Sequence, residues 1–167
     1  YKRQERFLKA LLQHFGRPPT QMSTVEAKPI TITDEKLRLL VGAGFRRINL
    51  GVQTLDRDLY AFHHHKEDMQ VAIDAIHKAK KAGFSYINID MMTGLEGQTP
   101  AIWDETLNTI RQLIADKLID SVFIYPFHDD PRSRTYRNRD RVPSFLETAH
   151  SDALARSMFE DLGWSEL

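Results

Sequence analysis

Short apolar segments alternate with amphipathic segments of helical length along this chain, and this alternation constrains the fold more than any other feature. Four segments have the character of strands, namely 23–26, 48–53, 86–92 and 121–125. Strands that are separated by helices lie parallel and become buried, so their interiors are apolar. A complete eight-unit barrel needs about 250 residues, whereas this chain has 167. We therefore predict an α/β fold, an incomplete parallel (β/α) TIM-like barrel of about four βα units.

The remaining segments carry apolar residues at helical spacing. We expect helices over 5–15, 34–43 and 68–83, a further helix from Pro100 onward, and a last one that contains Leu154, Met158 and Leu162. Thr33 and Thr99 precede two of these helices and can cap them. The stretch between the second strand and the third helix is interpreted as a polar loop. We expect residues 1–128 to form the partial barrel, with the arginine-rich loop and C-terminal helix of 129–167 in the same domain.

Composition and charge narrow the possible functions. Lysine plus arginine and aspartate plus glutamate both number 23, so net charge does not indicate a nucleic-acid or membrane partner. No apolar run approaches the ~20 residues of a membrane span. No secretory signal is visible, so we expect a cytoplasmic protein. Cysteine is absent, which excludes disulfides, thiolate metal sites and cysteine nucleophiles within these residues.

Polar side chains close the expected strands. Glu26, Gln53 and Asp90 end the first three strands, and His128 follows the fourth. The carboxyl ends of parallel strands meet at one rim, where α/β barrels build their sites. We therefore expect a ligand or catalytic site at this rim, with Tyr125 and His128 at the mouth of a substrate site.

Two clusters of basic residues allow alternative interpretations. Five arginines, of which Arg132 is the first, lie in segment 129–142; they could hold an anionic substrate by bidentate hydrogen bonds, or form a solvated loop. Three consecutive histidines occupy 63–65. Adjacent residues do not share a face of a helix, so we expect a solvated loop there and no metal site.

Three motifs at the strand ends occur in a recognisable order. They are Glu-Ala-Lys-Pro at 26–29, Gly-Val-Gln-Thr-Leu-Asp at 51–56, and Asn-Ile-Asp-Met-Met-Thr-Gly-Leu-Glu-Gly-Gln-Thr at 88–99. Together they resemble the oxygen-independent coproporphyrinogen III oxidase-like branch of the radical S-adenosylmethionine enzymes. This resemblance implies a partial α/β barrel. It also implies S-adenosylmethionine bound to a four-iron, four-sulfur cluster on a three-cysteine loop, and cleaved to a radical that abstracts hydrogen.

The resemblance assigns roles to individual positions. Glu26, Gln53 and Asp90 match residues expected to contact S-adenosylmethionine. An arginine of the family falls at His65 or, with a shifted register, at Lys66. Because the chain lacks cysteine, we expect the cluster only in a longer chain that carries the cysteine motif. Glu96 stands where the family commonly has proline.

The resulting hypothesis is the cofactor-contacting part of a radical S-adenosylmethionine enzyme. As part of a longer chain, it would be an oxidoreductase or methyltransferase that acts on a tetrapyrrole-like or other small organic molecule. One alternative is a non-redox, metal-dependent barrel enzyme that uses Glu26, Asp90 and His128. Another is a degenerate homologue that only binds ligands. Open barrel edges also predict self-association.

Overall fold

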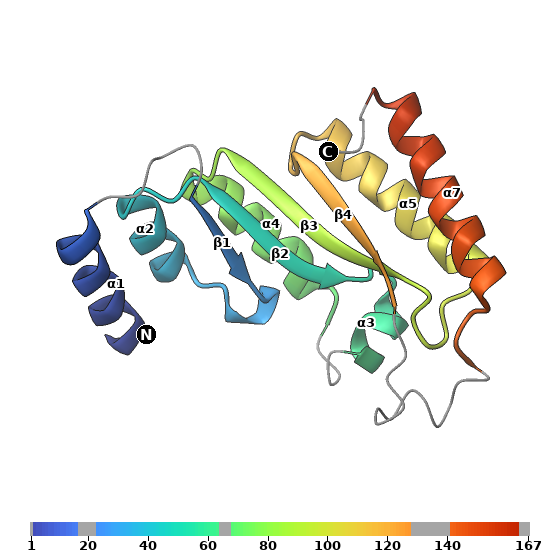
Figure 1. Cartoon of the computed structure of the whole chain (residues 1–167), viewed down its shortest axis with the longest axis horizontal. Helices are drawn as coiled ribbons and strands as arrows, with labels where there is room; N and C mark the ends of the chain where they lie inside the picture. The colour runs from blue at the N-terminus through green and yellow to red at the C-terminus, as the bar shows by residue number, and fades with distance from the viewer. Residues whose placement is uncertain (1, 17–22, 64–67, 128–140, 164–167) are drawn as a thin grey trace.

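The sheet contains four parallel strands in the order β1-β2-β3-β4. This computed structural model describes residues 2–16, 23–63, 68–127 and 141–163, and Figure 1 shows their arrangement. The strands are β1 (Thr24–Ala27), β2 (Arg47–Gln53), β3 (Tyr86–Thr93) and β4 (Ser121–Pro126). Consecutive strands are therefore neighbours in space, as in a stretch of a (β/α) barrel, and the predicted fold class is confirmed.

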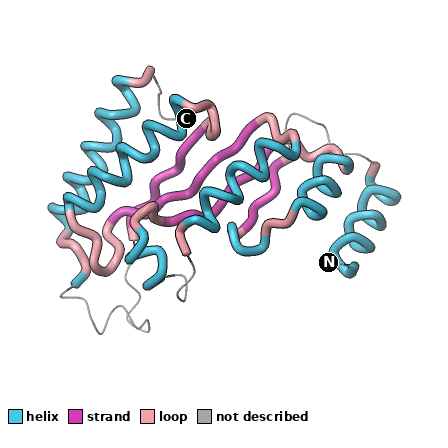
Figure 2. Tube along the Cα trace, turned by 180° about the vertical axis from the view of Figure 1, so that it is seen from behind, coloured by secondary structure: helices cyan, strands magenta, loops and turns pink. Residues whose placement is uncertain are grey.

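Helices lie between and beyond the strands. They are α1 (Lys2–Phe15), the 3₁₀ helix η1 (Pro29–Thr31), α2 (Asp34–Gly42), α3 (Arg57–His63), α4 (Gln70–Ala82), α5 (Pro100–Ala115) and α7 (Phe145–Asp161). Viewed from behind, α4 crosses one face of the sheet (Figure 2). The described helices leave the opposite face of the sheet uncovered, and Figure 1 looks onto it. This uncovered face is called the open face below.

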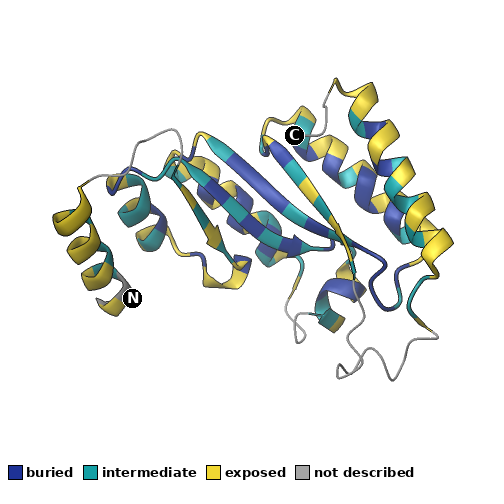
Figure 3. Cartoon of the chain, viewed as in Figure 1, coloured by how far each residue is buried: buried dark blue, intermediate teal, exposed yellow. Residues whose placement is uncertain are grey.

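The core lies between the sheet and its helices. Alternate residues of β2 and β3 point toward the helices and are fully buried: Ile48, Leu50, Val52, Ile87, Ile89 and Met91. They pack with the small residues of α4, which include Ala72, Ala75 and Ala79. Figure 3 shows this alternation of buried and partly exposed positions along the strands. Full burial of each large aliphatic side chain contributes about 1.5–3 kcal/mol, so this layer fixes which residues remain on the open face.

Strand register places polar residues side by side on the open face. Glu26 pairs laterally with Asn49, Asn49 with Asn88, and Asn88 with Ser121. Laterally paired residues of parallel strands present their side chains on the same face. The open face therefore carries one polar row across all four strands, halfway along the sheet.

Helix boundaries follow the expected capping chemistry. The hydroxyl oxygens of Thr33 and Thr99 accept hydrogen bonds from the backbone N–H groups of Lys36 and Ile102, each at 3.3 Å. Both predicted caps are confirmed. None of the helices in the described residues combines the length and apolar character needed to cross a membrane.

Two details of the prediction were wrong. The stretch after β2 is not simply a loop, because α3 forms there and buries Leu59 and Tyr60. Asp56 begins this helix by accepting a hydrogen bond from the backbone N–H of Leu59 at 2.8 Å. In addition, neither Glu26 nor Asp90 closes its strand, since β1 continues to Ala27 and β3 to Thr93. Asp90 therefore projects from the sheet itself.

Helix α7 packs beside the end of β3 and against α5. The indole Nε1 of Trp103 donates to the carbonyl of Ser151 at 2.8 Å, and the hydroxyl of Thr93 donates to Asp152 at 2.9 Å. A Cβ on Gly94, whose φ is 78°, would lie 3.0 Å from the hydroxyl of Thr148. This close approach explains why glycine follows β3.

Candidate functional site

The candidate site begins with two carboxylates on the open face. Glu26 lies on β1 in the polar row, and Asp90 lies two residues beyond Asn88 on the same side of β3. Burial raises the pKa of the Asp90 carboxyl above its usual value; a hydrogen bond from Asn88 opposes this, and the charge of Glu26 adds to it. The two carboxylates therefore interact across β2, and Asp90 is the more shielded of the two.

Gln53 reaches the same region through an irregular strand end. The register of β2 against β3 shifts between Gly51 and Gln53, and Gln53 has a φ of 70°. A Cβ on Gly51 would lie 3.0 Å from the side-chain Nε2 of Gln53. Because Gly51 pairs laterally with Asp90, the amide of Gln53 lies over the position beside that carboxylate.

Tyr125 adds a phenol from β4. It is laterally paired with Met92, is 50% exposed, and makes an edge contact with the ring of Phe123 at 6.5 Å between centroids. Burial raises the pKa of Tyr125, and the charges of Asp90 and Glu26 act in the same direction. The phenol therefore remains protonated at neutral pH and shares the electrostatic field of both carboxylates.

Sequence reasoning missed two buried polar residues that support Asp90. Asn88 and Ser121 are almost fully buried on the open face. Asn88 donates from Nδ2 to Asp90 Oδ1 at 2.7 Å, and Ser121 donates from Oγ to Asn88 Oδ1 at 2.7 Å. An asparagine inside an otherwise apolar strand was the available signal, because a buried amide needs partners.

The other predicted site residues lie outside the described residues. This applies to His65, Lys66, His128 and Arg132. Of the three consecutive histidines, His63 is described; it ends α3, and its Nε2 lies 3.3 Å from the carbonyl oxygen of Glu96. Within the described residues, no group of three or more acidic or histidine side chains could hold a metal ion.

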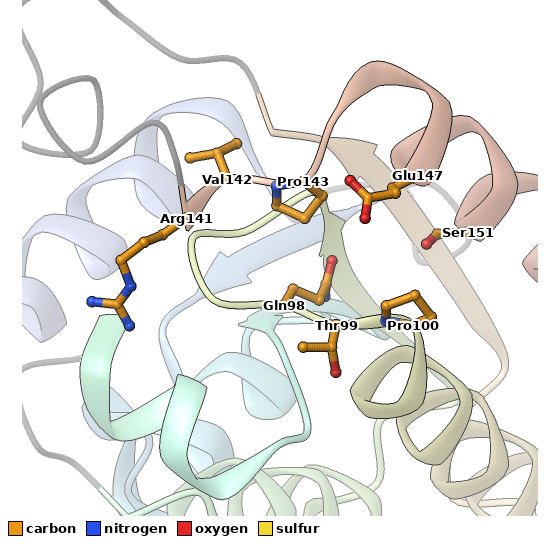
Figure 4. Close-up of a pocket in the computed structure, with 8 residues that line it drawn as sticks. All are labelled: Gln98, Thr99, Pro100, Arg141, Val142, Pro143, Glu147 and Ser151. Atoms are coloured by element: carbon orange, nitrogen blue, oxygen red, sulfur yellow. The ribbon is translucent and has the colours of Figure 1, made fainter.

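A buried carboxylate lies near the rim. Glu96 is 1% exposed and its Oε1 lies 3.6 Å from the guanidinium of Arg141. A pocket of about 170 Å³ lies between Gln98–Pro100 and the segment from Arg141 to Ser151. In Figure 4 the side chain of Arg141 extends away from the other lining residues. Neither Glu26 nor Asp90 lines this pocket, so it is separate from the carboxylates of the open face.

The open-face cluster has a definite chemistry. Two carboxylates, an amide and a protonated phenol offer acceptors for hydroxyl and ammonium groups, together with amide and phenol donors. Carboxylates attract a cationic ligand, and partial burial strengthens that attraction. The fold and the cluster together define a barrel-type α/β protein with a group of acidic and hydrogen-bonding side chains on the open face of its sheet.

Comparison with known families identifies the chain more narrowly. The model of the radical SAM superfamily matches residues 1–110. The chain therefore belongs to the radical S-adenosylmethionine superfamily, as its motifs predicted.

Relatives place the chain within that superfamily. It is 33% identical over 117 residues to the heme chaperone HemW of Bacillus subtilis, which covers 67% of this chain and 31% of that protein. It is 30% identical over 120 residues to the oxygen-independent coproporphyrinogen III oxidase of Escherichia coli, covering 72% of this chain and 26% of that enzyme. The solved structure of the Escherichia coli oxidase HemN superposes with a TM-score of 0.78 at 20% identity, over 96% of this chain and 37% of that one. The chain thus spans about a third of the length of these proteins.

The residues present suit one of the family's two cofactors. Members use S-adenosylmethionine together with a four-iron, four-sulfur cluster. The acidic open face fits the sulfonium, ammonium and ribose hydroxyls of S-adenosylmethionine. The cluster does not fit this chain, because the sequence has no cysteine to ligate it.

Proposed function

We propose that this chain is the cofactor-contacting part of a radical S-adenosylmethionine enzyme, with the binding site on the open face. The observation that carries the proposal is the strand register, which places Glu26, Asp90 and Tyr125 on the same face of three different strands. Gln53 comes from the end of the remaining strand, β2, and its amide lies over Gly51 beside Asp90.

Each residue has a role that follows from its chemistry. The carboxylates of Glu26 and Asp90 accept hydrogen bonds from ribose hydroxyls or the ligand ammonium and balance its positive charge. Gln53 can donate and accept at the same time, and so orients a polar edge of the ligand. In this family the bound S-adenosylmethionine supplies a radical that removes a hydrogen atom from the substrate. The protein's task is to hold the reactive carbon near the substrate and exclude water.

The proposed substrate is a tetrapyrrole-like small molecule. Relatives named as a coproporphyrinogen oxidase and a heme chaperone support this chemical class. Tyr125, with His128 and Arg132, is proposed to line the substrate side, where an arginine can hold a carboxylate in bidentate fashion. His65 and Lys66 remain proposed cofactor contacts. Oxidoreductase and methyltransferase chemistry both remain compatible with the site.

The domain division and the location also remain proposals. Hydrogen bonds from Trp103 to Ser151 and from Thr93 to Asp152 support the inclusion of 129–167 in the same domain as 1–128. A cytoplasmic location, without nucleic-acid or membrane partners, stays a prediction.

Calorimetric titration of this chain with S-adenosylmethionine tests the proposed site. Binding is expected, and D90N should weaken it about tenfold by removing a charge-assisted hydrogen bond. D104N is the matched control, because Asp104 is exposed on α5, away from the open face. Absence of binding, or equal weakening by both variants, would contradict the site.

The cluster is tested with a longer protein. A chain extended at its N-terminus to include a three-cysteine loop should become brown and oxygen-sensitive after anaerobic treatment with iron and sulfide. A correctly folded but colourless product would count against radical chemistry.

Two alternatives make different predictions. A metal-dependent barrel enzyme that uses Glu26, Asp90 and His128 would bind magnesium, manganese or zinc in calorimetry. A binding-only homologue would bind S-adenosylmethionine or a haem-like ligand without turnover. The identity to a protein named as a heme chaperone favours including hemin in these titrations.

A further inference from the structure

A chain of three hydrogen-bonded side chains crosses from β4 to β3 on the open face. The hydroxyl of Ser121 donates to Oδ1 of Asn88, and Nδ2 of Asn88 donates to Oδ1 of Asp90, both at 2.7 Å. Ser121 and Asn88 are lateral partners in the sheet register. Their packing therefore fixes the amide relative to both strands.

The donor and acceptor order of these two hydrogen bonds follows from the charge of Asp90. An ionised carboxylate only accepts hydrogen bonds, so Asn88 must turn its NH₂ group toward Asp90. Its carbonyl oxygen then faces Ser121, which has to donate. A protonated Asp90 would no longer impose this order, because a carboxylic acid can itself donate. The three groups therefore favour the same state, in which Asp90 is charged.

We propose that Asn88 and Ser121 are positioning residues that hold Asp90 charged and in one orientation for S-adenosylmethionine; this inference rests on the proposed function. The hydrogen bond from Asn88 uses Oδ1 of Asp90. Among the described residues, no donor forms a hydrogen bond to Oδ2, which keeps that oxygen for the ligand.

The electrostatic surroundings explain why Asp90 needs such support. Burial and the facing carboxylate of Glu26 both favour the protonated form of Asp90, and the phenol of Tyr125 lies in the same field. The amide of Asn88 opposes them. The charge-assisted hydrogen bond from Asn88 at 2.7 Å is thus the contact that favours the charged carboxylate, which can accept from a ribose hydroxyl.

The experiment follows the Asp90 carboxyl directly. Its pKa is measured by carbon-13 NMR titration of this chain in the wild type, N88A, S121A and S121T, and affinity for S-adenosylmethionine is measured alongside. N88A should raise the pKa of Asp90 and weaken binding about tenfold. S121A should move both in the same direction by less, and S121T, which keeps a hydroxyl, should restore them.

N49A provides the matched control. Asn49 occupies the same row on the neighbouring strand and pairs with Asn88 in the register, but no hydrogen bond joins its side chain to Asp90. The N49A substitution should leave the pKa of Asp90 unchanged, because Asn49 gives that carboxylate no hydrogen bond. Thermal unfolding identifies a variant that fails to fold, in which case the milder Ser121 pair decides the outcome.

The possible failures are distinguishable. If the wild type does not bind S-adenosylmethionine, the proposed function fails, while the NMR titration still tests the hydrogen-bond chain. If the wild type binds but N88A and S121A change neither pKa nor affinity, the positioning role is wrong. Equal effects of N49A and N88A on the pKa of Asp90 would also overturn it.

Discussion

Gly51 makes room for the Gln53 amide, and a single methyl group should disturb that arrangement. A Cβ at position 51 would lie 3.0 Å from Nε2 of Gln53. Ordinary contact begins near 3.5 Å, so in G51A the amide must move by about half an ångström. Gly51 does not adopt a positive φ, so alanine suits the backbone. Because a flexible side-chain end absorbs the displacement, the free energy of unfolding should change by less than about 0.5 kcal/mol.

The affinity should respond more than the stability. A neutral hydrogen bond contributes about 0.5–1.5 kcal/mol, so a misplaced amide should weaken S-adenosylmethionine binding about two- to twelvefold. Calorimetry measures the affinity, and urea denaturation measures the unfolding free energy. G42A is the matched control, because a Cβ on Gly42 would meet nothing within 4 Å.

A double-mutant cycle tests the physical reason. If Gly51 acts through the Gln53 amide, G51A should have no further effect on affinity when Gln53 is already alanine. Additive losses would show that Gly51 acts by another route. Unchanged binding by G51A, together with weaker binding by Q53A, would refute the link between the two residues.

Further predictions concern pH, packing and association. Burial raises the pKa of Asp90 above its ordinary value, so ionisation of this carboxyl opposes folding. The wild type should therefore lose stability as pH rises through the folded pKa, and D90N should abolish this loss in denaturant titrations. The pKa of Glu147 is shifted in the opposite direction, because hydrogen bonds from the backbone N–H and the hydroxyl of Ser144 lower it. The stability that the ionised Glu147 contributes should therefore be lost as pH falls through its folded pKa, and E147Q should show no such loss. W103F should lower the unfolding free energy by about 1–3 kcal/mol, because it loses a hydrogen bond and packs imperfectly. Urea denaturation measures this change, and an unaltered midpoint would contradict it. The outer edges of β1 and β4 should promote self-association. Light scattering that gives the mass of a monomer at high protein concentration would contradict this prediction.

The strands were predictable because parallel sheets leave a strong signal. Each strand was placed to within one or two residues, since the buried face of β2 and β3 demands uninterrupted aliphatic residues. Helix starts at Thr33 and Thr99 were predictable for a similar reason, because local hydrogen bonds from their hydroxyls define them. Both signals depend on neighbours in sequence.

The parts that were missed depend on neighbours in space. Helix α3 has seven residues, too few for a clear apolar period, and is stabilised by burial of Leu59 and Tyr60. The hydrogen bond from Ser121 to Asn88 joins residues 33 positions apart, so no local sequence pattern predicts it. Asp90 was expected at a strand end, but the pairing of β3 with β4 continues to Thr93. Roles for Glu26 and Gln53 came from motif resemblance, while their common surroundings emerge only from the register.

The backbone of Gln53 has a consequence for how this protein could be engineered. Its φ of 70° lies in the left-handed region, which costs a residue with a Cβ atom about 1 kcal/mol and costs glycine little. Replacement by glycine would relieve that strain and make the chain more heat-resistant, while deleting the amide. A directed-evolution campaign that screened for thermal robustness alone would therefore select against this side chain, so any such screen has to score ligand capture in the same round.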